Sequence, residues 1–318
     1  TWDVSNVTSM QEMFSRGGPY GNLNSGVKTL DISTWNVSKV TNMTSMFAYA
    51  DKLLTLTTTA DFEPGVSTSG ANLSYMFHYT SSLDTINGIT DWVYEEEFAF
   101  VKAYDWNVTG TKIAYIKFDE TEVPEFSMDM YNEGLYPTQT VFKYPKAGEK
   151  NALVSLHIYD VNSNGVKNIN LGNYNDFYIA RMKWTNDANT LSVQVLNRHQ
   201  NNLDLLFIDG NSGGVKIVMN EKDKAYVDVT DNLTFLKDNS FIWTSEKDGF
   251  NHIYLYDKNG KLKNQVTKGK WEVTNYYGLD EKTNTVFYQS VENGSINRDV
   301  YRFFYFNINK VVLVLYLL

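Results

Sequence analysis

Hydrophobic and polar residues alternate along most of the chain after about Thr85. This period of two is typical of β-strands that bury one face of a sheet. Polar segments separate the apolar runs, and two of them, Gly210–Gly214 and Lys258–Gly260, lie between paired runs, as hairpin turns do. The pattern predicts an antiparallel, all-β segment with strands at Lys112–Phe118, Thr190–Asn197, Leu203–Asp209, Val215–Met219, Phe241–Thr244, His252–Tyr256 and Thr285–Gln289.

A longer repeat runs through the same segment. Trp106, Trp184, Phe235 and Leu279 each precede a polar turn, and a new strand starts six or seven residues later. The gaps between these four positions are 78, 51 and 44 residues. A four-stranded propeller blade needs roughly 40 to 50 residues, so the last two gaps fit one blade each, and the first fits one blade with a long insertion, or two. The prediction is a partial β-propeller of about four to five blades.

The first 84 residues follow a different repeat. Thr1–Phe14 returns as Thr34–Phe47, with 9 of 14 positions identical, and Asn72–Phe77 keeps the end of the pattern. Fixed-period repeats of this kind stack their apolar positions in a solenoid. Each unit suits a short strand and turn, followed by Met43, Met46 and Phe47 at the spacing of one helical face. The methionines are therefore interpreted as core residues and not as ligands.

Composition excludes several classes of function. The 28 Lys and Arg residues against 37 Asp and Glu give a net charge of −9, which disfavours nucleic acid as a partner. The chain has no cysteine, and its four histidines are far apart, so we expect neither a metal site nor a cofactor. The longest apolar run, Val311–Leu318, has 8 residues, whereas a membrane-spanning helix needs about 20. No transmembrane segment is expected, and because residue 1 falls inside a repeat, the sequence is interpreted as a fragment.

Three consecutive carboxylates, Glu95, Glu96 and Glu97, stand out between the two regions. By themselves they are most simply a solvated acidic turn compensated by Lys102. The aromatic residues beside them, Trp92, Tyr94 and Phe98, could instead pin the acidic run to a rigid wall. Fixed carboxylates form charge-assisted hydrogen bonds to a primary ammonium group, so the segment is a candidate amine site.

Two resemblances to known families rest on these motifs. The array with the pattern Trp-(Asp/Asn)-Val-Ser-x-Val-Thr-x-Met-x-x-Met-Phe resembles BspA-like bacterial surface repeats, relatives of leucine-rich repeats. That likeness implies an adhesion or scaffold module without catalytic residues. The segments Asn87–Phe98, Lys112–Pro124, Tyr144–Gly148 and Thr267–Val273 are similar to the N-terminal propeller of dipeptidyl peptidase IV, a prolyl-oligopeptidase-type serine peptidase.

The second resemblance implies a substrate-binding role. In that family two propeller glutamates grip the free α-amino group of the peptide, so that cleavage follows the second residue, usually proline or alanine. By position in the motif the pair is Glu96 and Glu97, with Glu95 pointing elsewhere. We expect Asp91, Trp92 and Tyr94 to support them. A propeller arginine that helps to hold the substrate lies upstream in the family, where this chain carries surface repeats instead.

The catalytic part of the family chemistry is not expected in this chain. The serine on a G-x-S-x-G elbow, the aspartate, the histidine and the oxyanion tyrosine lie on a C-terminal α/β-hydrolase domain. We expect neither a G-x-S-x-G sequence nor such an elbow in this chain. His199 and His252 are interpreted as structural. The expected function is a substrate-gating, N-terminus-recognising propeller for release of Xaa-Pro or Xaa-Ala dipeptides, inactive alone; the alternative is a non-catalytic surface adhesion or scaffold protein.

The resemblances also imply organisation and context. The expected domains are surface repeats at 1–84, an incomplete propeller at 87–302 and an atypical apolar tail at 303–318. Expected partners are peptides with a free N-terminus and the hydrolase domain, and family members often form homodimers. The expected location is the bacterial cell envelope.

Overall fold

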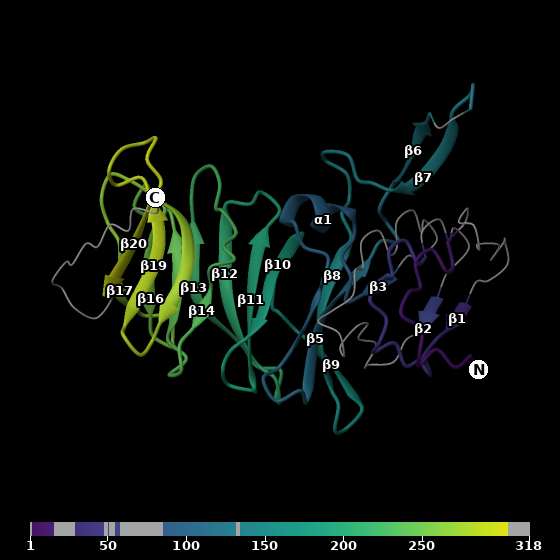
Figure 1. Ribbon diagram of the computed structural model, residues 1–318, viewed down its shortest axis with the longest axis horizontal. Coiled ribbons are helices and arrows are strands. Elements are labelled where there is room, and N and C mark those ends of the chain that lie inside the picture. Colours follow the sequence, from purple (N-terminus) through teal and green to yellow (C-terminus); the bar gives the residue numbers. More distant parts are fainter. Residues whose placement is uncertain are drawn as a thin grey trace. The chain divides into compact units, whose positions relative to one another are not determined.

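A computed structural model of the chain describes residues 2–15, 29–47, 50, 55–57, 85–131 and 134–304 (Figure 1). The chain divides into two compact units: Thr1–Ala103 with Ile116–Ser155, and Tyr104–Tyr115 with Leu156–Leu318. The third repeat copy at 72–77 and most of the tail after residue 302 lie outside the described residues. Within the described parts, no helix has the length and apolarity that crossing a membrane requires.

Twenty strands and one helix are assigned in the described residues, and most of the strands are antiparallel. The elements before the first long strand are β1 (Thr29–Asp31), β2 (Thr55–Thr57), β3 (Thr85–Asn87), α1 (Trp92–Phe98) and β4 (Tyr104–Trp106). The next are β5 (Lys112–Asp119), β6 (Glu125–Met130), β7 (Thr138–Lys143), β8 (Leu153–Asp160) and β9 (Gly165–Ile169). The remaining strands are β10 (Phe177–Trp184), β11 (Thr190–Asn197), β12 (Asn202–Asp209), β13 (Val215–Lys222), β14 (Thr234–Phe235), β15 (Phe241–Ser245), β16 (His252–Tyr256), β17 (Leu262–Gln265), β18 (Val273–Asp280), β19 (Thr285–Ser290) and β20 (Asp299–Phe304).

The two repeat copies at the start of the chain stack on each other as solenoid units do. The backbone N–H groups of Met10 and Phe14 donate to the carbonyls of Asn42 and Met46, at 2.8 and 2.7 Å. Equivalent aromatic residues also stack, with Phe14 and Phe47 ring centroids 5.2 Å apart. The core contains Val4, Met10, Phe14, Ile32, Trp35, Val37, Val40, Met43, Met46 and Phe47. The methionines are therefore core residues, as predicted.

One expectation for the repeats was wrong. Met46 and Phe47 lie in a turn and not in a helix, and the matching stretch of the first copy is also a turn. The apolar residues at this spacing still point into the core, because Met43, Met46 and Phe47 are fully buried. A single turn is too short to pay the cost of helix nucleation, so the inter-repeat backbone hydrogen bonds determine the conformation instead.

The longer repeat in the sequence corresponds to a strand–turn–strand pairing that occurs four times in the fold. Trp106, Trp184, Phe235 and Leu279 each pair directly with the first or second residue of the next strand: Ile113, Leu191, Phe241 and Val286. The resulting sheets are β3-β5-β8-β9 with β4 beside β5, β10-β11-β12-β13, β14-β15-β16-β17 and β18-β19-β20. The 78-residue gap is thus one blade with an insertion, the hairpin of β6 and β7. The fold is a partial propeller of antiparallel blades.

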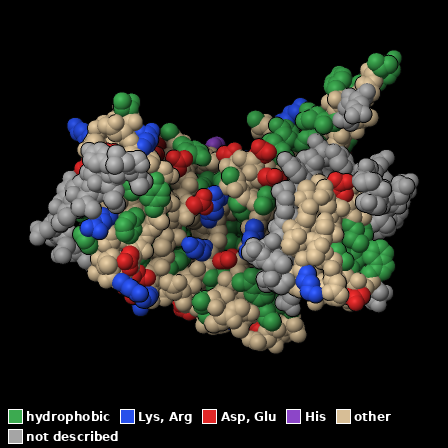
Figure 2. Space-filling view, in the orientation of Figure 1, with side chains coloured by type: hydrophobic (Ala, Val, Ile, Leu, Met, Phe, Trp, Pro, Cys, Tyr) green, Lys and Arg blue, Asp and Glu red, His purple; other side chains and the backbone are tan. Residues whose placement is uncertain are grey.

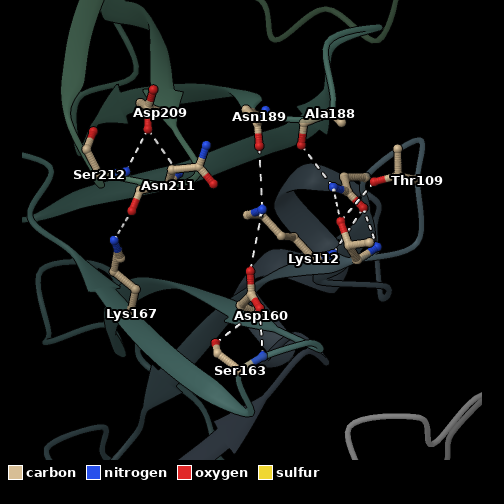
Figure 3. A network of polar contacts seen from close by, with 12 residues as sticks. Thr109, Lys112, Asp160, Ser163, Lys167, Ala188, Asn189, Asp209, Asn211 and Ser212 are labelled. Atoms are coloured by element: carbon tan, nitrogen blue, oxygen red, sulfur yellow. Dashed lines mark hydrogen bonds and ion pairs between the residues drawn. The ribbon is translucent and has the colours of Figure 1, made fainter.

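Neighbouring sheets of the second unit are joined by apolar packing and by polar contacts at their ends. Ile242, Ile253 and Leu255 pack with Val286 and Tyr288 of the following sheet. At another sheet pair, the Lys112 ammonium group contacts Asp160 Oδ2 at 3.5 Å and Asn189 Oδ1 at 3.4 Å (Figure 3). Lys112 is 8% exposed, so its charge is compensated by the carboxylate of Asp160 at the end of β8.

The inserted hairpin of β6 and β7 has exposed hydrophobic side chains on its surface. Its strands pair from Glu125 with Lys143 to Met130 with Thr138. Hydrophobic side chains gather along it (Figure 2), and Leu135 and Tyr136 are 97% and 85% exposed. Contiguous exposed apolar side chains of this kind mark interaction surfaces more often than isolated ones do.

Candidate amine-binding site

The acidic run lies on the short helix α1 and not in an acidic turn. Asp91 is the N-cap residue: its side chain accepts a hydrogen bond from the backbone N–H of Tyr94 at 3.0 Å. Aspartate is among the preferred N-cap residues because it satisfies a backbone donor that the first helical turn leaves unpaired. The helix stops at Ala99, which has a left-handed φ of 52°. The structure therefore replaces the expected acidic turn with a capped helix of seven residues.

Backbone hydrogen bonds hold both ends of the segment that carries α1. Gly88 N–H donates to Ile116 of β5 at 2.9 Å, and Ile116 N–H donates to Ala103 at 2.9 Å. Closer to the helix, Thr90 N–H donates to Val101 at 3.3 Å, and the Thr90 hydroxyl donates to the carbonyl of Phe100 at 2.9 Å. The helix thus lies within a short loop, and backbone hydrogen bonds hold both ends of this loop next to β5.

Aromatic packing fixes one side of the helix. Tyr94 and Phe98, one turn apart, are 2% and 4% exposed. The Tyr94 ring meets Phe98, Phe100 and Phe118 at centroid distances of 5.2, 5.8 and 4.8 Å. Burying a side chain such as Phe98 stabilises the fold by about 1.5–3 kcal/mol. The expected rigid wall is present, and Tyr94 is at its centre.

The three glutamates lie outside the side that Tyr94 and Phe98 bury, and all three are exposed. Successive residues of a helix are roughly 100° apart, so the carboxylates fan out around the axis. Glu96 lies on the side opposite the buried Tyr94 and Phe98, Glu97 lies next to it towards Tyr94, and Glu95 lies on its other side. Partial burial, followed by the neighbouring charge of Glu96, raises the pKa of Glu95. Glu96 therefore has one neighbouring glutamate on each side of it around the helix.

Asp91 is itself a buried carboxyl group. It is 6% exposed, and burial raises its pKa to about 6, while its hydrogen bond from the Tyr94 backbone acts in the opposite direction. A buried charge is tolerated at this position because the helix start supplies a hydrogen-bond donor and a favourable dipole. Asp91 thus acts through the helix and not at its exposed face.

Trp92, the remaining supporting residue, contacts a segment that sequence reasoning did not place at the site. Its ring lies 4.4 Å from the ring of Tyr144, which follows β7. Tyr144 had been noted only as the start of the Tyr144–Gly148 family motif. Sequence analysis also missed Thr90, Phe100 and Phe118, since nothing in a single sequence indicates contacts between residues so far apart.

The expectation that the chain has no G-x-S-x-G sequence was wrong as stated, because Gly210–Gly214 has these letters. The segment is the hairpin turn between β12 and β13, as the alternation pattern predicted, and not the strand-to-helix elbow of a hydrolase. Ser212 N–H donates to Asp209 Oδ1 at 2.6 Å (Figure 3). The Ser212 hydroxyl accepts a hydrogen bond from Gly214 N–H at 3.1 Å. Ser212 is therefore a turn residue.

His252 has a structural environment. It is fully buried, its Nδ1 lies 3.1 Å from the Thr267 hydroxyl and its Nε2 lies 3.1 Å from the carbonyl oxygen of Gly269. The Trp271 ring packs edge-on at 4.9 Å. Both ring nitrogens are engaged in the core of the blade, in agreement with the structural interpretation.

Both regions of the chain match known protein families. Residues 75–314 match the family described as the dipeptidyl peptidase IV (DPP IV) N-terminal region. Residues 1–92 match a family described as Mycoplasma protein of unknown function, DUF285. The two matches overlap at the segment that leads into α1.

Individual relatives agree with the first match. The crystal structure of dipeptidyl peptidase 4 from Porphyromonas gingivalis is 41% identical, with a TM-score of 0.69, over 74% of this chain and 33% of that one. The dipeptidyl peptidase 4 proteins of Trichophyton equinum and Trichophyton tonsurans are each 28% identical over 233 residues, 69% of this chain. The chain spans 30% of the length of these two curated relatives. Since the family match covers about three quarters of its 318 residues, the chain belongs to the dipeptidyl peptidase IV N-terminal region family.

Proposed function

We propose that this chain recognises the free α-amino end of a peptide through Glu96 and Glu97, as the propeller part of a dipeptidyl-peptidase-type serine peptidase. The observation that carries the proposal is the capped, aromatically anchored helix α1, which holds adjacent exposed carboxylates on a fixed frame. The family membership supports the same role. Propeller and hydrolase together would release Xaa-Pro or Xaa-Ala dipeptides.

The chemistry of the pair suits an amino terminus. A peptide α-amino group has a pKa of about 8, so it is mostly protonated at neutral pH. Two ionised carboxylates only accept hydrogen bonds, and an ammonium group only donates them. Because the helix is fixed before the ligand arrives, little conformational entropy is lost on binding. By binding the amino end, the site would fix how far the peptide extends towards a nucleophile on another domain. That nucleophile would then cleave the peptide bond after the second residue.

A binding experiment on the full chain tests this proposal. Isothermal titration with the dipeptide Ala-Pro should show binding, whereas N-acetyl-Ala-Pro should bind at least about tenfold more weakly, because acetylation removes the charge and the charge-assisted hydrogen bonds. Equal affinities for the two peptides would show that the amino group is not recognised.

The repeat array supports a second candidate, a surface scaffold at the bacterial cell envelope. Its stacked copies form their own core, and Trp2 at their edge is 63% exposed. The proposed boundaries are 1–84 for the repeats and 87–302 for the propeller. Mild protease treatment of intact cells should release peptides from residues 1–84 if the repeats are exposed at the cell surface. Release only after lysis would contradict it.

We also propose that the β6–β7 hairpin pairs two copies of this chain. The most exposed apolar residues of the hairpin are Leu135 and Tyr136. Replacing both by serine should shift a dimer towards monomer by at least about tenfold in dissociation constant, since apolar burial drives association. Sedimentation equilibrium measures this shift. Val108→Ser, at a 69% exposed position outside the hairpin, is the matched control and should leave the dimer unchanged.

A further inference from the structure

Four aromatic rings connect the base of the β6–β7 hairpin to helix α1, and they are called here the helix–hairpin cluster: Trp92, Phe126, Phe142 and Tyr144. Phe126 and Phe142 are directly paired across the two strands, with ring centroids 6.0 Å apart. Tyr144 lies 5.4 Å from Phe126 and 5.9 Å from Phe142. Its other neighbour is Trp92, the first residue of the helix, at 4.4 Å.

Tyr144 is itself held in place by the chain around it. Its backbone N–H donates to the carbonyl of Pro124 at 2.9 Å, which ties the segment after β7 to the segment before β6. The ammonium group of Lys146 lies 5.1 Å from the centre of the Phe126 ring, on the same cluster. The ring that Trp92 meets is therefore part of a fixed base and not of a free loop.

Trp92 gives α1 a contact on a second side, away from the side that Tyr94 and Phe98 bury. At roughly 100° per residue, Tyr94 and Phe98 cover one side of the helix, and Trp92 lies about 160° from Tyr94. A short helix anchored along one side only can roll about its axis. A roll of about 20° would move a carboxylate at the helix surface by roughly 2 Å, because side chains extend the helix radius to 5–6 Å. The Trp92 contact with Tyr144 lies on the second side of the helix, where it would oppose such a rotation.

The same geometry connects Trp92 to the ligand-binding residues. Glu96 follows Trp92 by four residues, and side chains at this spacing lie one above the other on one face of a helix. A change in the position of the Trp92 ring is therefore passed on most directly to Glu96, and through the backbone to Glu97.

We propose that Tyr144 is a positioning residue for the amine site, which acts through Trp92 to fix the rotation of the helix that carries Glu96 and Glu97. This inference rests on the proposed function. It makes the base of the hairpin, and not its exposed tip, a part of the substrate-recognition apparatus.

The test compares Tyr144→Ala with Tyr144→Phe in the full chain. Tyr144→Ala removes the ring and should weaken binding of Ala-Pro about tenfold, the effect expected for loss of one aromatic pair that positions a charged site. Tyr144→Phe keeps the ring and should restore affinity to that of the unchanged chain. Hydrogen exchange of the segment 92–99 should accelerate in Tyr144→Ala only, while exchange in β15 and β16 of the other unit stays the same.

A second variant removes the same contact from the other side. Trp92 is 38% exposed, so Trp92→Ala is tolerated more easily than a core change. Because both substitutions remove one contact, the double variant should bind no more weakly than either single variant. Shortening the hairpin tip between Met128 and Thr140 leaves the cluster in place and should not change the affinity.

The outcomes separate this inference from the proposed function. If Tyr144→Ala leaves either the affinity or the exchange of 92–99 unchanged, Tyr144 is not a positioning residue. Additive effects of Tyr144→Ala and Trp92→Ala would also overturn it, since they would then act separately. If the unchanged chain binds Ala-Pro and its N-acetyl form equally, the proposed function fails, and the exchange measurement alone decides whether Tyr144 holds the helix.

Discussion

Replacing Glu96 and Glu97 together by glutamine should abolish measurable binding of a dipeptide with a free amino group. Glutamine keeps the length of the side chain and one acceptor oxygen, but it removes the negative charge. A hydrogen bond to a charged group contributes about 1.5–3 kcal/mol, so the loss of two corresponds to roughly 100-fold or more in affinity. Isothermal titration with Ala-Pro measures the effect.

The neighbouring Glu95 provides the matched control. It has the same chemistry and lies on the same helix, but on the side of Glu96 away from Glu97. Glu95→Gln should therefore change the affinity less than about threefold, the scale of a modest change in a long-range charge interaction. A loss in Glu95→Gln as large as in the double variant would show that general negative charge, and not a specific pair, attracts the ligand.

The binding should also depend on the charge of the ligand. Above pH 8 the α-amino group loses its proton, and the attraction to the two carboxylates disappears with it. Affinity for Ala-Pro should fall as the pH rises through this value. The weak binding of N-acetyl-Ala-Pro, which has no titrating amine, should not follow the same curve.

Much of the propeller could be predicted from the sequence because its strands are regular and local. The expected strands at Thr190–Asn197 and His252–Tyr256 agree residue for residue with β11 and β16. The pairing of Trp184 with Leu191 explains why the sequence repeat was visible. A strand, a polar turn and the next strand are contiguous in sequence, so their pattern needs no long-range information.

The site itself was predictable only in part. The acidic run and its aromatic neighbours indicated an anchored amine site, but the helix was not expected, because seven residues with three adjacent glutamates show no clear helical periodicity. Its stability comes from contacts with Phe118 and Tyr144, which lie 20 residues or more beyond α1 in sequence. The hairpin of β6 and β7 was likewise anticipated only as an insertion of unknown structure.

The N-cap of the helix should make its stability depend on pH in an unusual direction. Most carboxylates of a folded protein have a lowered pKa and lose stabilisation in acid, as expected here for Asp119, whose hydrogen bonds from Thr121 lower its pKa. Asp91 has the opposite shift, from 3.8 to about 6, because it is buried. Ionisation of Asp91 therefore costs folding free energy. This cost grows as the pH rises from below 3.8 and is complete once the pH is well above 6.

Asp91→Asn isolates this cost, because asparagine keeps the cap oxygen but cannot ionise. The difference in opening free energy between Asp91→Asn and the unchanged chain should favour the variant more at pH 7.5 than at pH 4, by about 2 kcal/mol. A pH-independent penalty from burying the asparagine amide would change the opening free energy of the variant equally at pH 7.5 and at pH 4. The change between the two pH values would therefore stay the same. Hydrogen exchange of residues 92–98, corrected for intrinsic rates, measures it. If the two chains keep a constant difference across this range, Asp91 carries no raised pKa, and if the sign is reversed, its charge stabilises the helix that carries the glutamates.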